Sequence, residues 1–450
     1  AERLAALESE GVEAVSICLL HAAANPEHEE ALGELAEGFR FEEVVLSSRS
    51  SSAPRLVSRG DTALVDAYLG PVIGSYVASI GKAAPDAALR LLTSSGALSS
   101  ARAYSGKDSL LSGPAGGVVG AAEVARQAGS CRAIAFDMGG TSTDVSRWDG
   151  SFEMEHETLK AGVRIATPLL AIETVAAGGG SICDFDGEKL TVGPHSAGSV
   201  PGPACYGAGG PLTVTDMNFF LGRIPPGRFP FPLDEDAVRE RLESLAGSLG
   251  SRGYSRSLEE IAEGFLEIAD HRMAAAIRKI SLARGYDVRE YTLVAFGGAG
   301  AQHACSVARQ LGISRVIVPR LAGILSAWGA SQATITKIAE KPVLELLDSI
   351  TAQQLGGLLA ELEEQARKEV LDEGVEQEHV GVSSRNLDLR YRGQESSIEL
   401  ETTFERCRED FEEAHERLYG FTHPQRELEL VAARVSCEGL AGAAASEEED

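Results

Sequence analysis

Two aspartates, two glycines and three hydroxyl side chains crowd into the short stretch Asp137–Asp144. The pair Gly139-Gly140 lets the backbone turn sharply and bring its N–H groups close to an anion. Thr141, Ser142 and Thr143 can donate hydrogen bonds to phosphate oxygens, and an aspartate at a strand end can hold a hydrated Mg²⁺. A glycine pair alone would equally fit a β-hairpin turn. The added acids and hydroxyls favour a phosphate-binding loop.

Short apolar runs predict the elements that position this loop: a strand over 133–136 that ends at Asp137, and a second strand after Asp144. A further strand begins at Ile172 and leads into Gly178, Gly179, Gly180 and Ser181. Three glycines inside a sheet pattern mark the close approach of a backbone or a ligand. We expect contact with phosphate or substrate, and a flexible turn is the alternative.

Another glycine-rich turn, with Gly297, Gly298 and Gly300, joins a predicted strand at 291–296 to a helix. A strand, a glycine turn and a helix N-terminus form a recurrent nucleotide site, because free N–H groups and the helix dipole face the ligand. A predicted helix over 112–125 carries small residues on one face. Small residues allow close packing against a strand or a ligand, and we expect helix–sheet packing.

The glycine- and proline-rich segment 193–215 contains one cysteine, Cys205. Long irregular segments in compact domains are often functional. A cysteine nucleophile needs a base beside it, and only His195 is close in sequence. We expect Cys205 to be a small buried residue instead.

Composition narrows the class of protein. The chain has 450 residues, long enough for two to four domains, and a formal net charge of −26, which disfavours nucleic acid as a partner. Seven cysteines without a C-x-x-C pair fit a reducing cytoplasm rather than a disulfide framework or a zinc ribbon. No uninterrupted apolar run reaches membrane-spanning length, and the first residues do not form a signal peptide. Because the chain opens on Ala in mid-helix pattern, we expect a fragment.

The remaining patterns predict an α/β layer structure followed by an α+β module. Predicted helices cover 1–9, 26–39, 60–80, 234–249, 257–284, 323–334, 351–373 and 403–418. Predicted strands cover 14–20, 43–47, 90–93, 315–318, 385–391, 396–400 and 428–437, with hairpins at 151–156 and around Asp186-Gly187.

Six motifs occur in an order that resembles the A-type subunits of the hydantoinase/oxoprolinase family. They are SGPAGGVVGA at 112–121, DMGGTSTDV at 137–145, AAGGGSI at 176–182, SAG…PGPACYG at 196–207, LTVTD at 212–216 and FGGAGAQHA at 296–304. This group includes N-methylhydantoinase A, the corresponding half of 5-oxoprolinase and the β subunit of acetone carboxylase.

The resemblance implies the actin-like ATPase fold of sugar kinases and Hsp70, in which two ribonuclease-H-like lobes clasp ATP. Asp137–Asp144 resembles the second of two phosphate loops, and a first loop of the D-x-G-G-T-x-T-D type is absent here. The implied organisation is the remainder of an N-terminal lobe at 1–95, the ATPase core at 96–345, an incomplete α+β module at 346–440 and a disordered tail at 441–450.

The same resemblance implies an ATP-dependent hydrolase subunit that opens a cyclic amide, such as 5-oxoproline or a hydantoin, by phosphorylating its carbonyl oxygen. It assigns Asp137 to Mg²⁺ through water, Gly139–Thr143 to phosphate, Asp144 to a water or to anchoring the loop, Gly178–Ser181 to the phosphate side of the cleft, and Gly297, Gly298 and Gly300 to the adenosine side. Ring hydrolysis is expected on a B-type partner in a cytoplasmic hetero-oligomer, in line with the lack of a clustered His/Cys/Asp metal motif here. An acetone carboxylase component, a small-molecule kinase and an ATP-driven activator of a partner enzyme stay open as alternatives.

Overall fold

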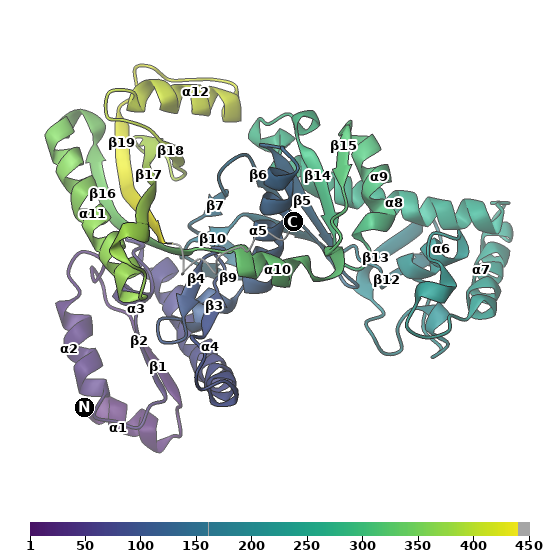
Figure 1. The fold of residues 1–450 in the computed structure, drawn as a ribbon, viewed down its shortest axis with the longest axis horizontal. Coiled ribbons are helices and arrows are strands. Elements are labelled where there is room, and N and C mark those ends of the chain that lie inside the picture. The colour runs from purple at the N-terminus through teal and green to yellow at the C-terminus, as the bar shows by residue number, and fades with distance from the viewer. Residues whose placement is uncertain (161, 440–450) are drawn as a thin grey trace, which may run out of the picture. The chain divides into compact units, whose positions relative to one another are not determined.

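The computed structural model describes residues 1–160 and 162–439, which form a mixed α/β structure. These residues divide into two compact units (Figure 1). The first unit comprises Ala1–Ala115, Met154–Leu170 and the chain from Ala333 onward, and the second comprises Gly116–Glu153 and Ala171–Gln332. The predicted fold class, α/β with an additional α+β part, agrees with this mixture of elements.

A five-stranded sheet forms the centre of the second unit, in the order β11-β6-β5-β14-β15. Its strands are β5 (Ala133–Met138), β6 (Thr143–Trp148), β11 (Ile172–Val175), β14 (Thr292–Phe296) and β15 (Arg315–Ile317). β5, β6 and β11 pair antiparallel, whereas β5, β14 and β15 pair parallel. Every residue of β14 is buried, as expected for a strand inside a covered parallel sheet.

The other elements of this unit are α5 (Ser112–Gln127), which begins in the first unit, β12 (Ser181–Phe185), β13 (Leu190–Ser196), α6 (Val214–Phe220), α7 (Glu235–Gly250), α8 (Leu258–Ile280), α9 (Gly300–Leu311) and α10 (Leu325–Gln332). α8 starts at a capping box, in which Ser257 and Glu260 satisfy each other's backbone N–H groups. Its apolar stripe, including Ile261, Phe265 and Met273, is buried in the main core cluster. The sequence periodicity predicted this helix and its role in core packing.

The glycines of α5 lie against other elements of the second unit. A Cβ atom on Gly117 would lie 2.7 Å from the Phe296 ring, and one on Gly120 would lie 2.8 Å from the Leu325 carbonyl oxygen. Gly329 of α10 is closer still, since a Cβ there would lie 1.9 Å from the carbonyl oxygen of Gly116. The packing interpretation of the small-residue face is confirmed.

The first unit contains a six-stranded sheet in the order β18-β17-β19-β16-β4-β3. Its strands are β3 (Arg90–Leu92), β4 (Leu98–Ser100), β16 (Ile335–Leu346), β17 (Val380–Tyr391), β18 (Ile398–Glu401) and β19 (Leu428–Gly439). α11 (Ala352–Asp372) packs on β16, β17 and β19, and α12 (Cys407–Tyr419) contacts β18.

The rest of the first unit is built on the parallel pair β1 (Ala14–Ile17) and β2 (Glu43–Leu46). Around this pair lie α1 (Glu2–Ser9), α2 (Glu27–Ala36), α3 (Ser47–Ser50) and α4 (Leu56–Ala83). Two small antiparallel pairs complete it: β7 (Met154–Glu155) with β10 (Leu169–Leu170), and β8 (Thr158–Lys160) with β9 (Val163–Ile165). The predicted hairpin at 151–156 is wrong, because β7 pairs with β10 instead.

The units follow boundaries other than those expected at 95 and 345. Leu98 of β4 pairs with Ile335 of β16, and the Leu98 N–H donates to the Thr334 carbonyl oxygen. This pairing joins residues before 100 to the C-terminal strands in one sheet, so they cluster as one unit. The tail expected at 441–450 lies outside the described residues.

By length and composition alone, α4 could cross a membrane, although no uninterrupted apolar run predicted such a span. Its first half carries buried polar side chains. Arg59 is fully buried and donates to the Ser47 hydroxyl and the Leu19 carbonyl oxygen, and Asp66 accepts from the Ser50 hydroxyl. These contacts tie α4 to the segments around β1 and β2.

Candidate phosphate-binding site

Asp137 and Asp144 face each other across the antiparallel pair β5–β6. Residues directly opposite on such a pair share a face of the sheet, so the two carboxylates lie on one side. Burial and the charge of Asp144 raise the pKa of Asp137 to about 6, and a hydrogen bond from Ser326 opposes this rise. Two neighbouring carboxylates, one of them with a raised pKa, suit a divalent cation, whose charge would offset their repulsion.

The turn between these strands is exposed and tight. The Gly139 N–H donates to the Ser142 carbonyl oxygen at 3.0 Å, which closes the turn, while Gly140 and Thr141 are exposed. Among the described residues, no acceptor pairs with the N–H groups of Gly140, Thr141 or Ser142. An anion could therefore accept hydrogen bonds from the turn, and its binding there stays a prediction.

Thr143 takes a different position from its two neighbours. Its side chain is fully buried, and its hydroxyl donates to the carbonyl oxygen of Ala177. The hydroxyl therefore anchors β6 to the segment after β11, on the face opposite to Asp144. Only Thr141 and Ser142 offer hydroxyls on the open side of the turn, which corrects the expected phosphate contact of the Thr143 hydroxyl.

The three glycines after β11 lie beneath the turn and are buried. The N–H groups of Gly179 and Gly180 donate to the carbonyl oxygens of Gly139 and Gly140, at 3.0 and 2.6 Å. A Cβ on Gly178 would lie 2.6 Å from the Ser142 nitrogen. The close approach predicted here is therefore made by the backbone of the 139–143 turn. Ser181 is also buried, and its hydroxyl accepts from the Gly178 N–H.

The turn after β14 adjoins Asp137. Gly297 has a φ of +78°, and a Cβ there would lie 2.4 Å from a carboxylate oxygen of Asp137. The Ala299 N–H donates to the Met138 carbonyl oxygen at 3.0 Å. Gly298 is exposed, and Gly300 is buried at the start of α9. The glycine-rich segments at 139–140, 178–180 and 297–300 thus meet at one end of the sheet.

The structure adds side chains that the sequence did not single out. Thr174 lies opposite Asp144 on β11 and donates to its carboxylate at 2.6 Å, and Ser326 bonds to Asp137. Strand alternation would have suggested Thr174 once the pairing with β6 was known, but no local signal marks Ser326. Thr213 is the N-cap of α6, and Asp216 completes a capping box.

Cys205 is fully buried, as expected, and its N–H donates to a carboxylate oxygen of Asp216 at 2.7 Å. Burial and the charge of Asp216 raise the pKa of its thiol well above the usual range. His195 is exposed on the same segment and makes no bond to the thiol. The thiol is therefore held in its unreactive form.

Replacing Cys205 with alanine is expected to lower the free energy of unfolding by about 1 kcal/mol, because a buried sulfur atom is removed from the core. Urea denaturation measures this loss. Unchanged stability would show that the thiol does not contribute to core packing.

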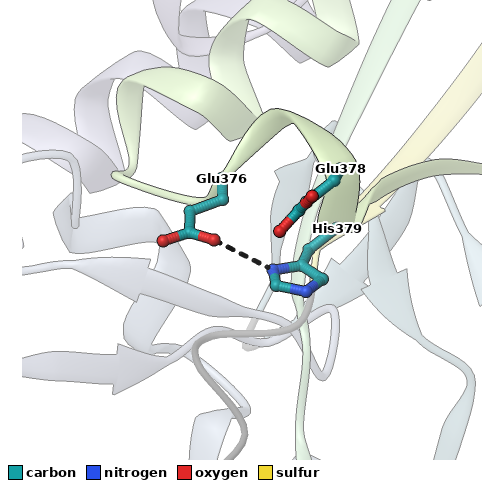
Figure 2. Close-up of side chains that lie close together, drawn as sticks. All are labelled: Glu376, Glu378 and His379. Carbon is teal, nitrogen blue, oxygen red and sulfur yellow. Dashed lines mark ion pairs between the residues drawn. The ribbon is translucent and has the colours of Figure 1, made fainter.

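Figure 2 shows one further group, in the first unit, whose side chains lie close together: Glu376, Glu378 and His379. Their possible ligand atoms lie within 4.8 Å of one another, and the His379 ring pairs with Glu376 at 3.7 Å. All three side chains are exposed, and exposed acidic groups commonly exist without a metal. No other such group occurs among the residues that the structure describes.

Taken together, the second unit presents a mixed sheet with a glycine-rich turn suited to phosphate and a pair of carboxylates beside it. Residues 59–339 match the hydantoinase/oxoprolinase family, and the chain belongs to that family.

Similar proteins from yeast, a plant and a bacterium support this membership of the family. The chain is 38% identical to the 5-oxoprolinase of Saccharomyces cerevisiae over 98% of its own length and 36% of that protein. It is 38% identical to 5-oxoprolinase 1 of Arabidopsis thaliana, covering 96% of this chain and 36% of that protein. The alpha subunit of caprolactamase from Pseudomonas jessenii is 31% identical over 93% of this chain and 63% of its own length. The chain thus spans about a third of the length of these 5-oxoprolinases.

Two solved structures resemble the fold. An ATP-dependent caprolactamase from Pseudomonas jessenii superposes with a TM-score of 0.88 at 28% identity, covering 97% of this chain and 67% of the other. Nucleotide-free acetone carboxylase superposes with a TM-score of 0.70 at 23% identity, covering 97% and 66%. The second similarity concerns the fold alone.

Proposed function

We propose that this chain is the ATP-binding part of an enzyme that couples ATP cleavage to the opening of a cyclic amide of the 5-oxoproline or hydantoin type. The observation that carries the proposal is the facing pair Asp137 and Asp144 beside the exposed turn at Gly140–Ser142. The sheet order, in which β11, β6 and β5 pair antiparallel and β14 and β15 extend the sheet in parallel, supports a ribonuclease-H-like lobe of an actin-like ATPase. Relatives named 5-oxoprolinase and caprolactamase support the substrate class.

An unactivated amide resists attack by water because its carbonyl carbon shares the nitrogen lone pair and is a poor electrophile. Transfer of the γ-phosphoryl group from ATP to the carbonyl oxygen releases ADP and gives an imidoyl phosphate, whose carbon water can attack. The ring C–N bond then breaks as the nitrogen takes a proton, and hydrolysis of the resulting acyl phosphate releases phosphate. In such a transfer the protein mainly positions the reactants and stabilises charge. The N–H groups of the 140–142 turn and the hydroxyls of Thr141 and Ser142 would hold the phosphate oxygens.

The carboxylates fit a Mg²⁺ ion, because they are oxygen ligands that share one face and repel each other. When bound, the ion neutralises phosphate charge. Asp137 would hold it through water, and Asp144, fixed by Thr174, would orient a water molecule or brace the turn. We further propose a cytoplasmic assembly with a B-type subunit that carries the hydrolytic site.

The test measures ADP and phosphate release by the chain, with and without a B-type partner, in the presence of 5-oxoproline, hydantoin or caprolactam. The proposal expects release to rise only when a cyclic amide is present, with the open-chain product formed in equal amount. ATP turnover that ignores cyclic amides and depends on a partner protein would favour an activator. A phosphorylated hydroxyl product would indicate a kinase, and bicarbonate-dependent consumption of acetone would indicate a carboxylase.

Gly140 offers a probe of the turn that spares the fold. A Cβ there meets no atom within 4 Å, and the backbone φ is not in the left-handed region, so alanine fits without strain. The added methyl group enters open space beside the N–H groups that are proposed to hold phosphate. Gly140→Ala is therefore expected to weaken binding of an ATP analogue by about tenfold, or about 1.4 kcal/mol, with an unchanged melting temperature.

Isothermal titration calorimetry and thermal denaturation measure these two effects. Gly247→Ala, at an exposed position inside α7, is the matched control and should change neither affinity nor the fold. Unchanged affinity in Gly140→Ala would place the phosphates elsewhere.

A further inference from the structure

A network of polar side chains joins helices of the second unit, and all of its members except the exposed Arg223 are buried. Arg223 lies 3.4 Å from the Asn218 side-chain oxygen, the Asn218 nitrogen lies 2.9 Å from His303 Nε2, and His303 Nδ1 lies 2.6 Å from an Asp270 carboxylate oxygen. Asn218 and His303 are fully buried, and Asp270 is 2% exposed. None of these residues has a role in the function proposed above.

The hydrogen bonds of this network all run in one direction, with each donor on the side of Arg223 and each acceptor on the side of Asp270. Arginine can only donate, so the Asn218 oxygen faces Arg223 as the acceptor, and the Asn218 NH₂ group donates to His303 Nε2. His303 Nε2 therefore carries no proton, and Nδ1–H donates to Asp270. Each of these three hydrogen bonds has one donor and one acceptor, and hydrogen bonds between buried side chains rigidify the elements they join.

Two of the joined helices support the glycine-rich segments of the site. Asn218 lies on α6, and in the first turn of that helix both the N–H and the hydroxyl of Thr215 donate to the Gly179 carbonyl oxygen, at 2.7 and 2.8 Å. His303 lies in the first turn of α9, directly after the Gly297 turn that adjoins Asp137. The bond between Asn218 and His303 thus links the support of Gly179 to the helix that follows Gly297.

We propose that His303 is a positioning residue that holds the segments 176–182 and 296–302 in register with each other. Because Gly179 and Gly180 bond to the turn at Gly139-Gly140, and Gly297 touches Asp137, this register also sets the turn against the carboxylate. Its consequence for ATP binding rests on the function proposed above. Displacements of about 1 Å at such sites can cost a hundredfold in rate.

Two variants of His303 separate its bonds. Asparagine carries a donor at the same number of bonds from Cβ as Nδ1, so His303→Asn keeps the bond to Asp270 and loses the bond to Asn218. Glutamine carries an acceptor at the place of Nε2, so His303→Gln keeps the bond to Asn218 and loses the donor to Asp270. Phe265→Leu is the matched control, because Phe265 is buried in the core around α8 and takes part in none of the hydrogen bonds of the network.

The direct measurement is amide hydrogen exchange across the 450-residue chain, in the absence of nucleotide, with melting temperatures recorded alongside. His303→Asn is expected to speed exchange about tenfold in 176–182 and 296–302 together, whereas His303→Gln keeps the two segments within about threefold of wild type. Phe265→Leu should speed exchange along α8 without this selectivity. With the magnesium complex of a non-hydrolysable ATP analogue, His303→Asn should raise Kd about tenfold.

The inference is overturned if exchange in His303→Asn rises in neither segment or in only one of them. It is also overturned if the rise is no more selective than in Phe265→Leu. Both outcomes hold regardless of the affinity for nucleotide. Equal exchange in the asparagine and glutamine variants overturns it as well, because the bond to Asn218 would then not matter. If exchange rises selectively in these segments but the wild-type chain binds no nucleotide, the positioning role of His303 is supported and the proposed function is contradicted.

Discussion

Replacing Asp137 with asparagine is expected to abolish ATP cleavage and, at neutral pH, to stabilise the folded chain. The rate should fall by several powers of ten, because the carboxylate that would hold the metal against the phosphates is lost. The free energy of unfolding should rise because the wild-type carboxylate is ionised at neutral pH, although its partly buried position beside Asp144 disfavours the charge. Burial and the facing Asp144 both raise its pKa.

The linkage between proton binding and folding sets the sign of the change in stability with pH. The pKa of Asp137 is about 6 in the folded chain, above the ordinary value of 3.8, so the folded state binds the extra proton between these values. This contribution to stability is present below pH 4 and is lost as the pH rises through about 6. With a discount for partial exposure, the loss amounts to about 1–2 kcal/mol, which asparagine restores at pH 7.5.

Urea denaturation of wild type and Asp137→Asn at pH 4 and pH 7.5, together with ADP release, measures both effects. Asp144→Asn serves as the companion variant, since it removes the repulsion and should lower the pKa of Asp137. If Asp137→Asn turned over ATP near the normal rate, or gained no stability at pH 7.5, the carboxylate pair would not have the role given to it here.

Replacing Gly329 with alanine is expected to cost about 3 kcal/mol or more of the free energy of unfolding. Its Cβ would lie 1.9 Å from the carbonyl oxygen of Gly116 and 2.5 Å from the nitrogen of Gly120. Both neighbours are backbone atoms of α5, so no side chain can turn aside, and the two helices must move apart. Phe296 of the central sheet packs on the same part of α5 and would lose contact as well.

Gly113→Ala on the same helix is the control, because a Cβ there meets nothing within 4 Å. Helix propensity predicts a neutral or slightly stabilising effect, by at most about 1 kcal/mol. Chemical denaturation of both variants gives the comparison. A loss in Gly329→Ala no larger than that in Gly113→Ala would show that the helices are not in backbone contact.

The sequence predicted the elements around the site well, because their signals are local. The apolar runs before Asp137 and Gly297 are strands, and each ends in a glycine-rich turn. It could not tell that the glycines at 178–180 approach the backbone of the 139–143 turn, because glycine permits the close approach of a backbone or of a ligand. Thr143 was predictable, since adjacent residues of a strand face opposite sides and its neighbour Asp144 faces the site.

The sequence did not predict strands that form only by pairing with segments far away in the chain. The strand β16, Ile335–Leu346, contains Pro342 and alternating charges, which disguise a strand, and its register shifts between Pro342 and Glu345. Its pairing with Leu98 joins residues far apart in the chain and moves the boundaries between the units. No local pattern in the sequence encodes that contact.

The central claim is that the turn at Gly139–Thr143 grips the polyphosphate of a nucleotide. The most direct measurement is a crystal structure of the chain with Mg²⁺ and a non-hydrolysable ATP analogue. The account predicts phosphate oxygens within hydrogen-bond distance of the N–H groups of Gly140–Ser142, and a hydrated ion beside Asp137. An analogue bound at another place, with this turn empty, would contradict it.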